Sequence, residues 1–259
     1  MSDVVQRHQT STEGTRSRTT RVQEVVLRLR DLIARAELPP DGRLPSEQEL
    51  SQRFGASRAT VREALTVLEG EGLIARRRGL GRFLNRLALN LPTRLEEVWD
   101  FADMIRSSGY RPSSRYEGMT LGPVAPAVAE KLAIPPGSEV LTTKDVFLAD
   151  GIPVIYCIDT LPSSLVRSGY APEELEGPIY TFLTVRCGQR VDYNITEIAP
   201  TVADRKLGLL LGCRRGSPLL YLEEVGFNAQ GEPVLHSQEY YRPEYFSFRV
   251  LRKMTPAAL

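Results

Sequence analysis

Apolar residues recur at helical spacing in the first third of the chain, where they form two separate stripes. The first stripe consists of Val22, Val25, Val26, Leu29, Leu32 and Ile33. It predicts a helix from Arg21 to Ala36, which the Pro39–Gly42 segment ends. The second stripe, Val61, Ala64, Leu65 and Leu68, has the i, i+3, i+4, i+7 spacing of one buried helix face. It predicts a second helix with a solvated polar side.

Short polar motifs mark where helices begin and end in this region. Ser46 and Glu49 form an S-x-x-E capping box, which predicts that a helix begins there. Gly55 ends that helix because glycine tolerates a left-handed backbone, and Ser57 can cap the next helix. The sequence therefore predicts two short helices joined by the turn Gly55-Ala56-Ser57.

Two stretches with strand character follow. Ile74–Arg77 and Arg82–Leu84 can pair as a hairpin, because the tip Arg78–Gly81 contains the glycines that a tight turn requires. A helix-turn-helix followed by a basic hairpin is typical of a winged helix-turn-helix, which reads double-stranded DNA.

The polar side of the second helix holds the candidate base-reading residues. The pattern leaves outside the residues Arg58, Ala59, Thr60, Arg62 and Glu63. Arg58 and Arg62 are four residues apart near the helix N-terminus, where a recognition helix meets base edges, and arginine pairs bidentately with guanine.

Each of these features also has an ordinary explanation. Any solvated helix can carry two arginines, and Arg76-Arg77-Arg78 can be one more charged patch. The caps, turn, buried stripe and hairpin together favour DNA binding. A nucleotide-binding interpretation of Gly79-Leu80-Gly81 lacks the third glycine and the βαβ frame.

The second part of the chain has a different pattern. Leu95–Ser107 is predicted to be a helix that Gly109 terminates, and strands follow from about Arg115. One series of motifs then recurs about 80 residues later. The first copy consists of Glu130-Lys131-Leu132, Gly137-Ser138, an apolar strand and a turn at Asp150-Gly151. The second copy consists of Arg205-Lys206-Leu207, Gly216-Ser217, an apolar strand and a turn at Gln230-Gly231. The repeat predicts an α+β domain, an antiparallel sheet with helices on one side and a cleft between two matched hairpins. Hairpins with glycine turns are also common without any repeat.

Charge and length support a division into domains. Although the net charge is +1, residues 20–86 carry +4 and residues 87–259 carry −4, so the basic surface belongs to the first unit. We predict a disordered arm over 1–19, a winged helix over 20–86, a linker over 87–94 and a second domain over 95–253. The chain shows no signal peptide or transmembrane stretch, which predicts a cytoplasmic protein without a membrane partner.

The first unit resembles the GntR family of bacterial transcription regulators. The residues that carry the resemblance are Leu44-Pro45-Ser46-Glu47, the Phe54–Arg62 core, Gly72-Leu73-Ile74 and Gly79-Leu80-Gly81. The expected DNA-contacting residues are Ser46, Gln48, Ser57, Arg58, Ala59, Thr60, Arg62, Arg77, Arg78 and Gly79. Gln48 departs from the arginine that family members usually have there, and glutamine can bond adenine or phosphate.

The second unit looks like the UTRA effector domain of that family. The motifs that carry the resemblance are Leu148–Pro153, Leu161-Pro162, Pro178-Ile179-Tyr180, Gly231-Glu232-Pro233 and Tyr240-Tyr241-Arg242. The resemblance implies a chorismate-lyase-like fold, a homodimer on a palindromic operator in double-stranded DNA, and a small-molecule effector in the cleft of the sheet.

The expected effector site differs from that of family members that bind sugar phosphates. The family members that bind sugar phosphates carry two arginines, a glutamate, a serine, a second glutamate and a tyrosine in this site. At the matching positions, in the same order, this chain has Asp145, Phe147, Cys157, Pro178, Leu235 and Tyr241. A phosphate would lack charge-assisted partners, so we expect an effector that is not a sugar phosphate. An apolar, aromatic, cationic or hydroxylated molecule is expected instead, bound by Asp145, Phe147, Cys157, Tyr180, Leu235, Ser237, Glu239 and Tyr241.

Signatures of catalysis are weak. His236 has no partner at catalytic spacing and is more typical of a satisfied sheet residue, and the adjacent carboxylates of Glu173-Glu174 and Glu223-Glu224 point in different directions. Cys157, Cys187 and Cys213 have no metal-ligand spacing. We therefore expect no enzyme, no cofactor and no metal. Two alternatives to an effector-released repressor stay open, namely a regulator without a small-molecule effector and an enzyme of the chorismate-lyase-like fold.

Overall fold

A computed structural model describes residues 21–33, 35, 38–86, 95, 100–166 and 178–252. It divides into two compact units between residues 91 and 92, with residues 251–259 grouped with the first unit. Each unit is described by itself. The predicted arm over 1–19, the predicted linker over 87–94 and Trp99 lie outside the described residues.

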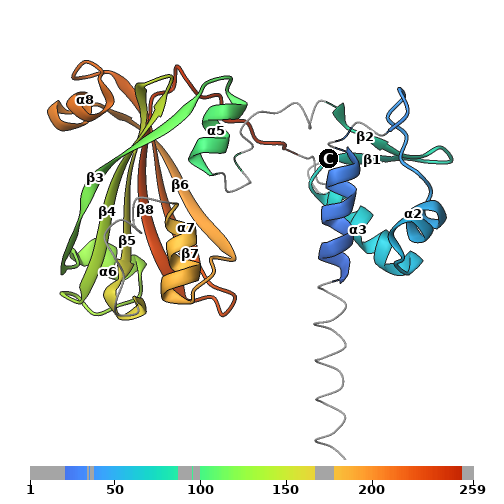
Figure 1. The fold of residues 1–259 in the computed structure, drawn as a ribbon, viewed down its shortest axis with the longest axis horizontal. Coiled ribbons are helices and arrows are strands. Elements are labelled where there is room, and N and C mark those ends of the chain that lie inside the picture. Colours follow the sequence, from blue (N-terminus) through green and yellow to red (C-terminus); the bar gives the residue numbers. More distant parts are fainter. Residues whose placement is uncertain are drawn as a thin grey trace, which may run out of the picture. The chain divides into compact units, whose positions relative to one another are not determined.

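The first unit is a winged helix-turn-helix (Figure 1). A helix over residues 21–33 precedes α2 (Glu47–Phe54), α3 (Arg58–Gly70) and the antiparallel pair β1 (Ile74–Arg77) and β2 (Gly81–Leu84). Its core combines both predicted stripes with residues that flank them: Val25, Leu29, Leu32, Ile33, Leu44, Leu50, Val61, Ala64, Leu65, Leu68, Leu73 and Ile74. The apolar pattern thus holds the wing against the three helices.

The predicted helix boundaries are confirmed in this unit. The Ser46 hydroxyl accepts from the Glu49 N–H at 3.2 Å, and the Ser46 N–H donates to Glu49 Oε2 at 2.7 Å. Gly55 ends α2 with φ of 62°, and the Ser57 side chain caps α3 by accepting from the Thr60 N–H. These contacts satisfy backbone donors that the first turn of a helix leaves without partners.

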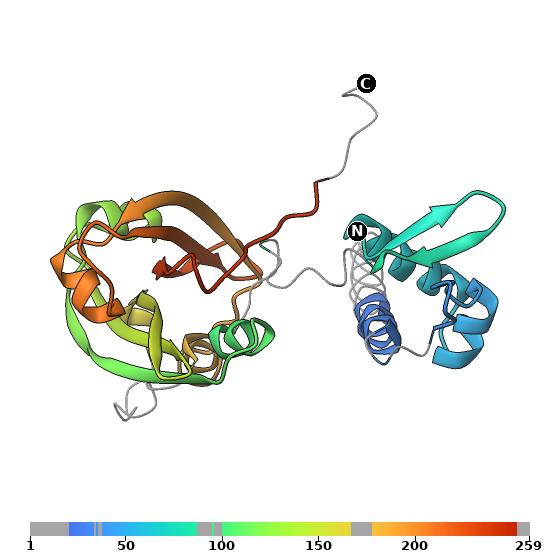
Figure 2. The ribbon, with the colours of Figure 1, turned by 90° about the horizontal axis from the view of Figure 1, so that it is seen from above.

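The second unit is an α+β domain built on one six-stranded antiparallel sheet. Its strands are β3 (Pro112–Pro123), β4 (Glu139–Ala149), β5 (Ile152–Pro162), β6 (Tyr193–Val202), β7 (Pro218–Phe227) and β8 (Pro233–Tyr241), in the order β3-β4-β5-β8-β7-β6. The helical elements are α5 (Phe101–Ser107), α6 (Pro126–Lys131), η1 (Ser163–Leu165), α7 (Ile179–Phe182), η3 (Leu183–Cys187) and α8 (Arg205–Leu211). The sheet curves strongly (Figure 2).

The predicted internal repeat is present in the topology. The series β3-α6-β4-β5 recurs as β6-α8-β7-β8. From the centre of the sheet outward, the strands of the first half follow in the order β5, β4, β3, and those of the second half in the order β8, β7, β6. β5 and β8 therefore pair at an approximate twofold axis, with β4 and β7 flanking them. The cleft expected between the two hairpins faces this central group of four strands.

The prediction that helices cover only one side of the sheet is wrong. α5, α7 and η3 pack on one face, where Ile105 and Phe182 are buried. α8 packs on the opposite face, against a cluster that contains Val146 and Tyr156. Because the central strands bury side chains on both faces, each face needs its own cover.

The helix expected over Leu95–Ser107 begins later than predicted. Among the described residues it starts at Phe101, because the Asp100 side chain accepts from the N–H groups of Ala102 and Asp103. Asp100 is a better N-cap than any residue near Leu95, since its carboxylate also lies at the positive end of the helix.

Candidate nucleic-acid interface and ligand cavity

The N-terminal end of α3 presents an exposed polar surface in the first unit. The expected DNA-contacting residues Ser46, Gln48, Ser57, Arg58, Ala59, Arg62, Arg77, Arg78 and Gly79 are all exposed. Arg58 forms no ion pair within the described residues. Its guanidinium is therefore available for an acceptor on a ligand, and an exposed arginine at this place fits the guanine contact expected of it.

Thr60 is an exception to the predicted exposure. Only 8% of it is exposed, because its hydroxyl lies 2.8 Å from the Ser57 hydroxyl and completes the cap of α3. The helical pattern placed Thr60 outside, since it is not part of the apolar stripe. Its position three residues after the N-cap turns the side chain back toward Ser57 instead.

Arg62 is held by a carboxylate, which the sequence did not reveal. Its Nη2 lies 2.8 Å from Glu47 Oε2 and its Nε lies 3.1 Å from the same oxygen. Glu47 also accepts from Arg82 Nη1 at 3.0 Å, so one carboxylate joins α2, α3 and the wing. Hydrogen bonds from Arg62 and Arg82 lower the pKa of Glu47 to about 2. Arg62 is still 61% exposed, so it faces solvent in a fixed plane.

The wing supplies further basic groups. The guanidinium of Arg77 lies 4.4 Å from the centre of the Phe83 ring, and Arg78 and Gly79 occupy the exposed tip. A cation held on an aromatic face keeps its charge and its outward donors. Recognition helix and wing thus present cationic groups in one small unit.

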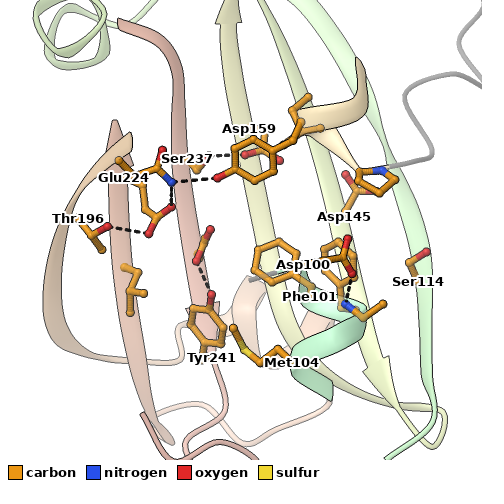
Figure 3. A pocket seen from close by; sticks show the side chains of 18 of the residues that line it. Asp100, Phe101, Met104, Ser114, Asp145, Asp159, Thr196, Glu224, Ser237 and Tyr241 are labelled. Atoms are coloured by element: carbon orange, nitrogen blue, oxygen red, sulfur yellow. Dashed lines mark hydrogen bonds between the residues drawn. The ribbon is translucent and has the colours of Figure 1, made fainter. Parts of the chain in front are cut away.

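A cavity of about 880 Å³ lies in the second unit between the sheet, α5 and the segment that begins at Pro178 (Figure 3). Strands β4, β5, β7 and β8 supply its floor, and Phe101, Tyr180 and Tyr241 give it aromatic walls. A volume of this size is typical of a pocket for a small organic molecule.

Six of the eight expected ligand-binding residues line this cavity. They are Asp145, Phe147, Tyr180, Ser237, Glu239 and Tyr241. The other two, Cys157 and Leu235, do not line it, and a ligand contact at these positions stays a prediction. Cys157 is 1% exposed and its thiol contacts Asp159, whereas Leu235 packs in the core beside Phe182. Both occupy the correct face of the sheet by strand alternation but are covered by neighbouring side chains.

Besides the predicted Asp145 and Glu239, the cavity contains two carboxyl groups that sequence reasoning did not assign to it, those of Asp159 and Glu224. Asp159 accepts from the Ser237 hydroxyl, and Glu239 accepts from the Tyr241 hydroxyl. Glu224 accepts from Asn194 at 2.8 Å and from Thr196 at 2.8 Å. The internal repeat offered a signal for them, because Asp145 and Asp159 of the first half correspond to Glu224 and Glu239 of the second.

Burial shifts the pKa of these groups upward. Burial raises the pKa of Asp159 to about 6. Burial also raises the pKa of Glu224, and it raises that of Glu239 well above its usual value, with further contributions from the charges of Glu224 and Asp159. Desolvation and mutual repulsion both disfavour the ionised form, so the cavity favours proton binding by these carboxyl groups.

Basic side chains are scarce around the cavity. Of the described residues that line it, Arg106 alone is basic, and its exposed guanidinium pairs with Asp103. The arginines expected of a sugar-phosphate site are replaced by Asp145 and Phe147, both of which lie in the cavity.

Two further groups lie apart from the cavity. His236 is 1% exposed and lies 2.7 Å from Glu223 Oε1, as expected for a satisfied sheet residue. Glu223 contacts Lys131 of α6 at 2.8 Å, whereas Glu224 lines the cavity, so the two adjacent carboxylates do point apart. In the described parts of the chain, no set of three or more His, Cys, Asp and Glu side chains is arranged to hold a metal ion. None of the described helices has the length and apolarity to span a bilayer.

A winged helix-turn-helix with a basic exposed face, joined in one chain to an α+β unit with a deep cavity, defines a DNA-binding transcription regulator of two domains. Models of known families give the particular family. Residues 21–84 match the gntR family of bacterial regulatory proteins, and residues 107–247 match the UTRA domain. The chain therefore belongs to the gntR family, with a UTRA domain as its second unit.

Individual relatives agree with this assignment. The HTH-type transcriptional repressor NagR of Bacillus subtilis is 28% identical over 225 residues, which cover 87% of this chain and 91% of NagR. The crystal structure of YydK of Bacillus subtilis, described as a possible transcriptional regulator, has the same fold, with a TM-score of 0.71 and 21% identity over 90% of this chain and 99% of YydK. PhnF of Mycobacterium smegmatis gives a TM-score of 0.56 and 20% identity, covering 87% and 98% of the two chains.

Proposed function

We propose that this protein is a sequence-specific repressor of transcription that a small molecule releases from DNA. The repressor role is supported by the likeness to NagR, a transcriptional repressor. The observation that carries DNA binding is the exposed N-terminal end of α3, where Arg58 has no ion pair among the described residues and Arg62 is held in a fixed plane. The groups that read base edges are thus already in place before DNA binds.

The cavity of the second unit is the proposed effector site. It encloses enough space for a small metabolite and combines aromatic walls with a few polar groups, which is the usual composition of such a site. A sugar phosphate is disfavoured there. It would bring a dianion next to buried carboxyl groups, and Asp145 stands where an arginine would be needed. In this proposal the carboxyl groups bind a ligand and carry out no catalysis.

A homodimer is part of the proposal. One winged helix contacts only a few base pairs, so two copies related by a twofold axis are needed for useful affinity on a palindromic operator. Sedimentation of the purified protein at micromolar concentration should give a dimer, and the shifted operator should carry two copies. A stable monomer that binds DNA as a single copy would contradict this part of the proposal.

The central experiment begins by selecting bound fragments from a genomic DNA library and defining the operator. Fluorescence anisotropy then measures the affinity of the full-length protein for the operator and for a scrambled duplex. Arg58→Ala should cost about 1 to 3 kcal/mol on the operator and little on the scrambled duplex. Arg111→Ala, at a residue of the second unit, is the matched control and should change neither affinity. Equal affinity of the wild type for both duplexes would refute sequence-specific binding.

A further inference from the structure

Three carboxyl groups of the cavity, those of Asp159, Glu224 and Glu239, are held by neutral partners only within the described residues. The hydroxyls of Ser237 and Tyr241 and the side chains of Asn194 and Thr196 donate to Asp159, Glu239 and Glu224, and no Lys, Arg or His among the described residues pairs with any of the three. Asp159 and Glu239 are each 6% exposed. Buried carboxylates are normally paired with a cation, because desolvation otherwise disfavours their charged form.

One carboxylate oxygen in this group has no partner. Glu239 lines the cavity and is 94% buried, yet it accepts only the Tyr241 hydroxyl, on Oε2. Its second oxygen, Oε1, has no hydrogen-bond partner among the described residues. Oε1 is not among the fully buried atoms that lack a partner in the described parts of the chain, so it is open to the cavity, where a donor on a ligand can reach it.

The internal repeat explains why the carboxyl groups converge. Asp159 on β5 is opposite Ser237 on β8, which in turn is opposite Glu224 on β7. Glu239 on β8 is opposite Cys157 on β5, which in turn is opposite Asp145 on β4. The approximate twofold axis between β5 and β8 thus brings acids from both halves to the same floor. Figure 3 shows Asp159 and Glu224 on either side of Ser237.

We propose that the effector is an organic cation whose protonated amine or quaternary ammonium group is held by Asp159, Glu224 and Glu239. This inference rests on the proposed function, because it assigns the chemical class of the effector in the same cavity. A cation there would stabilise the ionised carboxylates that burial disfavours. The rings of Phe147, Tyr180 and Tyr241 suit the apolar part of such a ligand and can also face its charge.

The main probes share a phenyl group on a short chain and differ chiefly in charge, and a sugar phosphate and a diamine are added to them. Isothermal titration calorimetry with the full-length protein at about pH 7.5 compares 2-phenylethylamine and its trimethylammonium analogue with neutral 2-phenylethanol, anionic 3-phenylpropanoate and glucose 6-phosphate. 1,4-Diaminobutane tests whether two charges bind better than one. We expect at least one cation to bind about tenfold or more tightly than the alcohol, and neither anion to bind.

Matched variants test which carboxyl groups bind the positive charge of the ligand. Glu239→Gln should lower the affinity for the cation about tenfold while leaving that for 2-phenylethanol unchanged. Glu224→Gln should act in the same direction, which keeps the test open if one variant folds poorly. Glu130→Gln, at an exposed residue of α6, should change neither affinity. Melting temperatures of the variants without ligand confirm that they are folded.

Several results would overturn the cationic assignment. They are binding of the alcohol or an anion as tightly as the cations, binding of Mg²⁺ or Ca²⁺ in place of the amines, no binding of any cation at about 10 mM, and unchanged affinity in Glu239→Gln. In each case the proposed function can still be checked separately. A neutral or anionic metabolite that occupies the cavity and releases the operator would preserve that function, whereas loss of specific operator binding would refute it.

Discussion

A buried carboxyl group such as Asp159 should make the stability of the protein depend on pH. Its pKa is raised from 3.8 to about 6, so the folded state binds more protons than the unfolded state between about pH 4 and pH 6. The free energy of unfolding therefore falls as the pH rises through that interval, by about 3 kcal/mol for this group alone. Glu224 and Glu239 act in the same direction.

The variant Asp159→Asn removes this contribution. Urea unfolding at about pH 4 and about pH 7.5 should show that the wild type loses about 3 kcal/mol more than the variant across the interval. The pH dependence that remains in the variant is the sum over all other titrating groups, including Glu224 and Glu239, which lower stability as the pH rises, and Glu47, whose lowered pKa acts in the opposite direction. Parallel pH profiles of wild type and variant would show that Asp159 is not buried as described.

The fixed plane of Arg62 leads to a second prediction at the level of single residues. Arg62→Lys keeps the charge but cannot reproduce the two-nitrogen contact with Glu47, so the direction of its donors is lost. The variant should bind the operator about tenfold more weakly and the scrambled duplex almost unchanged. Arg77→Lys is the control, because a phosphate contact needs only the charge, and both affinities should stay close to those of the wild type. Equal losses on both duplexes in Arg62→Lys would mean that Arg62 contacts only phosphate.

Sequence reasoning predicted which face of the sheet a side chain lies on better than it predicted whether other parts of the protein cover that side chain. Strand alternation placed Asp145, Phe147, Ser237 and Glu239 on the face of the sheet that lines the cavity, because every second residue of a strand shares a face. Alternation says nothing of which part of that face a helix or neighbouring side chain covers. Leu235 was therefore assigned to the cavity although it packs beside Phe182 of α7. The contact of Glu47 with Arg62 joins residues 15 positions apart on two helices, and no local pattern predicts such a pair.

Local motifs determine the elements of the first unit. The Ser46 capping box and the Ser57 cap begin their helices where predicted, because such contacts depend only on residues within one turn. The start of α5 was misplaced by the same kind of reasoning. Its apolar pattern extends upstream of Asp100, and the cap was not recognised.

The cap of α3 allows stability and DNA binding to be separated. Ser57→Ala removes the acceptor for the Thr60 N–H and should destabilise the winged-helix unit by about 1 kcal/mol. Ser57→Asp restores a capping oxygen and should leave stability within about 0.5 kcal/mol of the wild type. Its added negative charge at the DNA surface should nevertheless weaken operator binding about tenfold. Thermal unfolding and anisotropy on the same samples check this. Unchanged operator affinity in Ser57→Asp would place the end of α3 away from DNA.

At the scale of the whole molecule, the order of strands was predicted in part. The repeated motifs indicated two matched hairpins, and the sheet does contain two matched halves. Their pairing through β5 and β8 depends on contacts between distant segments, which periodicity alone does not specify. The covering of both faces of the sheet and the convergence of four acids follow from that pairing.

A ligand can release DNA only if it binds better to the arrangement that does not fit the operator. Linkage then requires that the operator weaken ligand binding by the same factor, and each 1.4 kcal/mol of coupling corresponds to about tenfold. Phe147→Ala should abolish the response to ligand while the ligand-free affinity for the operator stays within about 0.5 kcal/mol. Tyr241→Phe tests the same site with less disturbance, because Tyr241 is 1% exposed and packs against Phe246 and Phe248.

The most direct test of the central claim measures both sides of this linkage in one protein. The dissociation constant of the full-length protein for its operator is measured by anisotropy without ligand and with a saturating concentration of the tightest-binding amine of the calorimetric series. The dissociation constant for the amine is measured with and without operator. We predict that each constant rises about tenfold or more, by the same factor. An operator affinity that does not change while calorimetry shows the cavity to be occupied would contradict the claim that this cavity controls DNA binding.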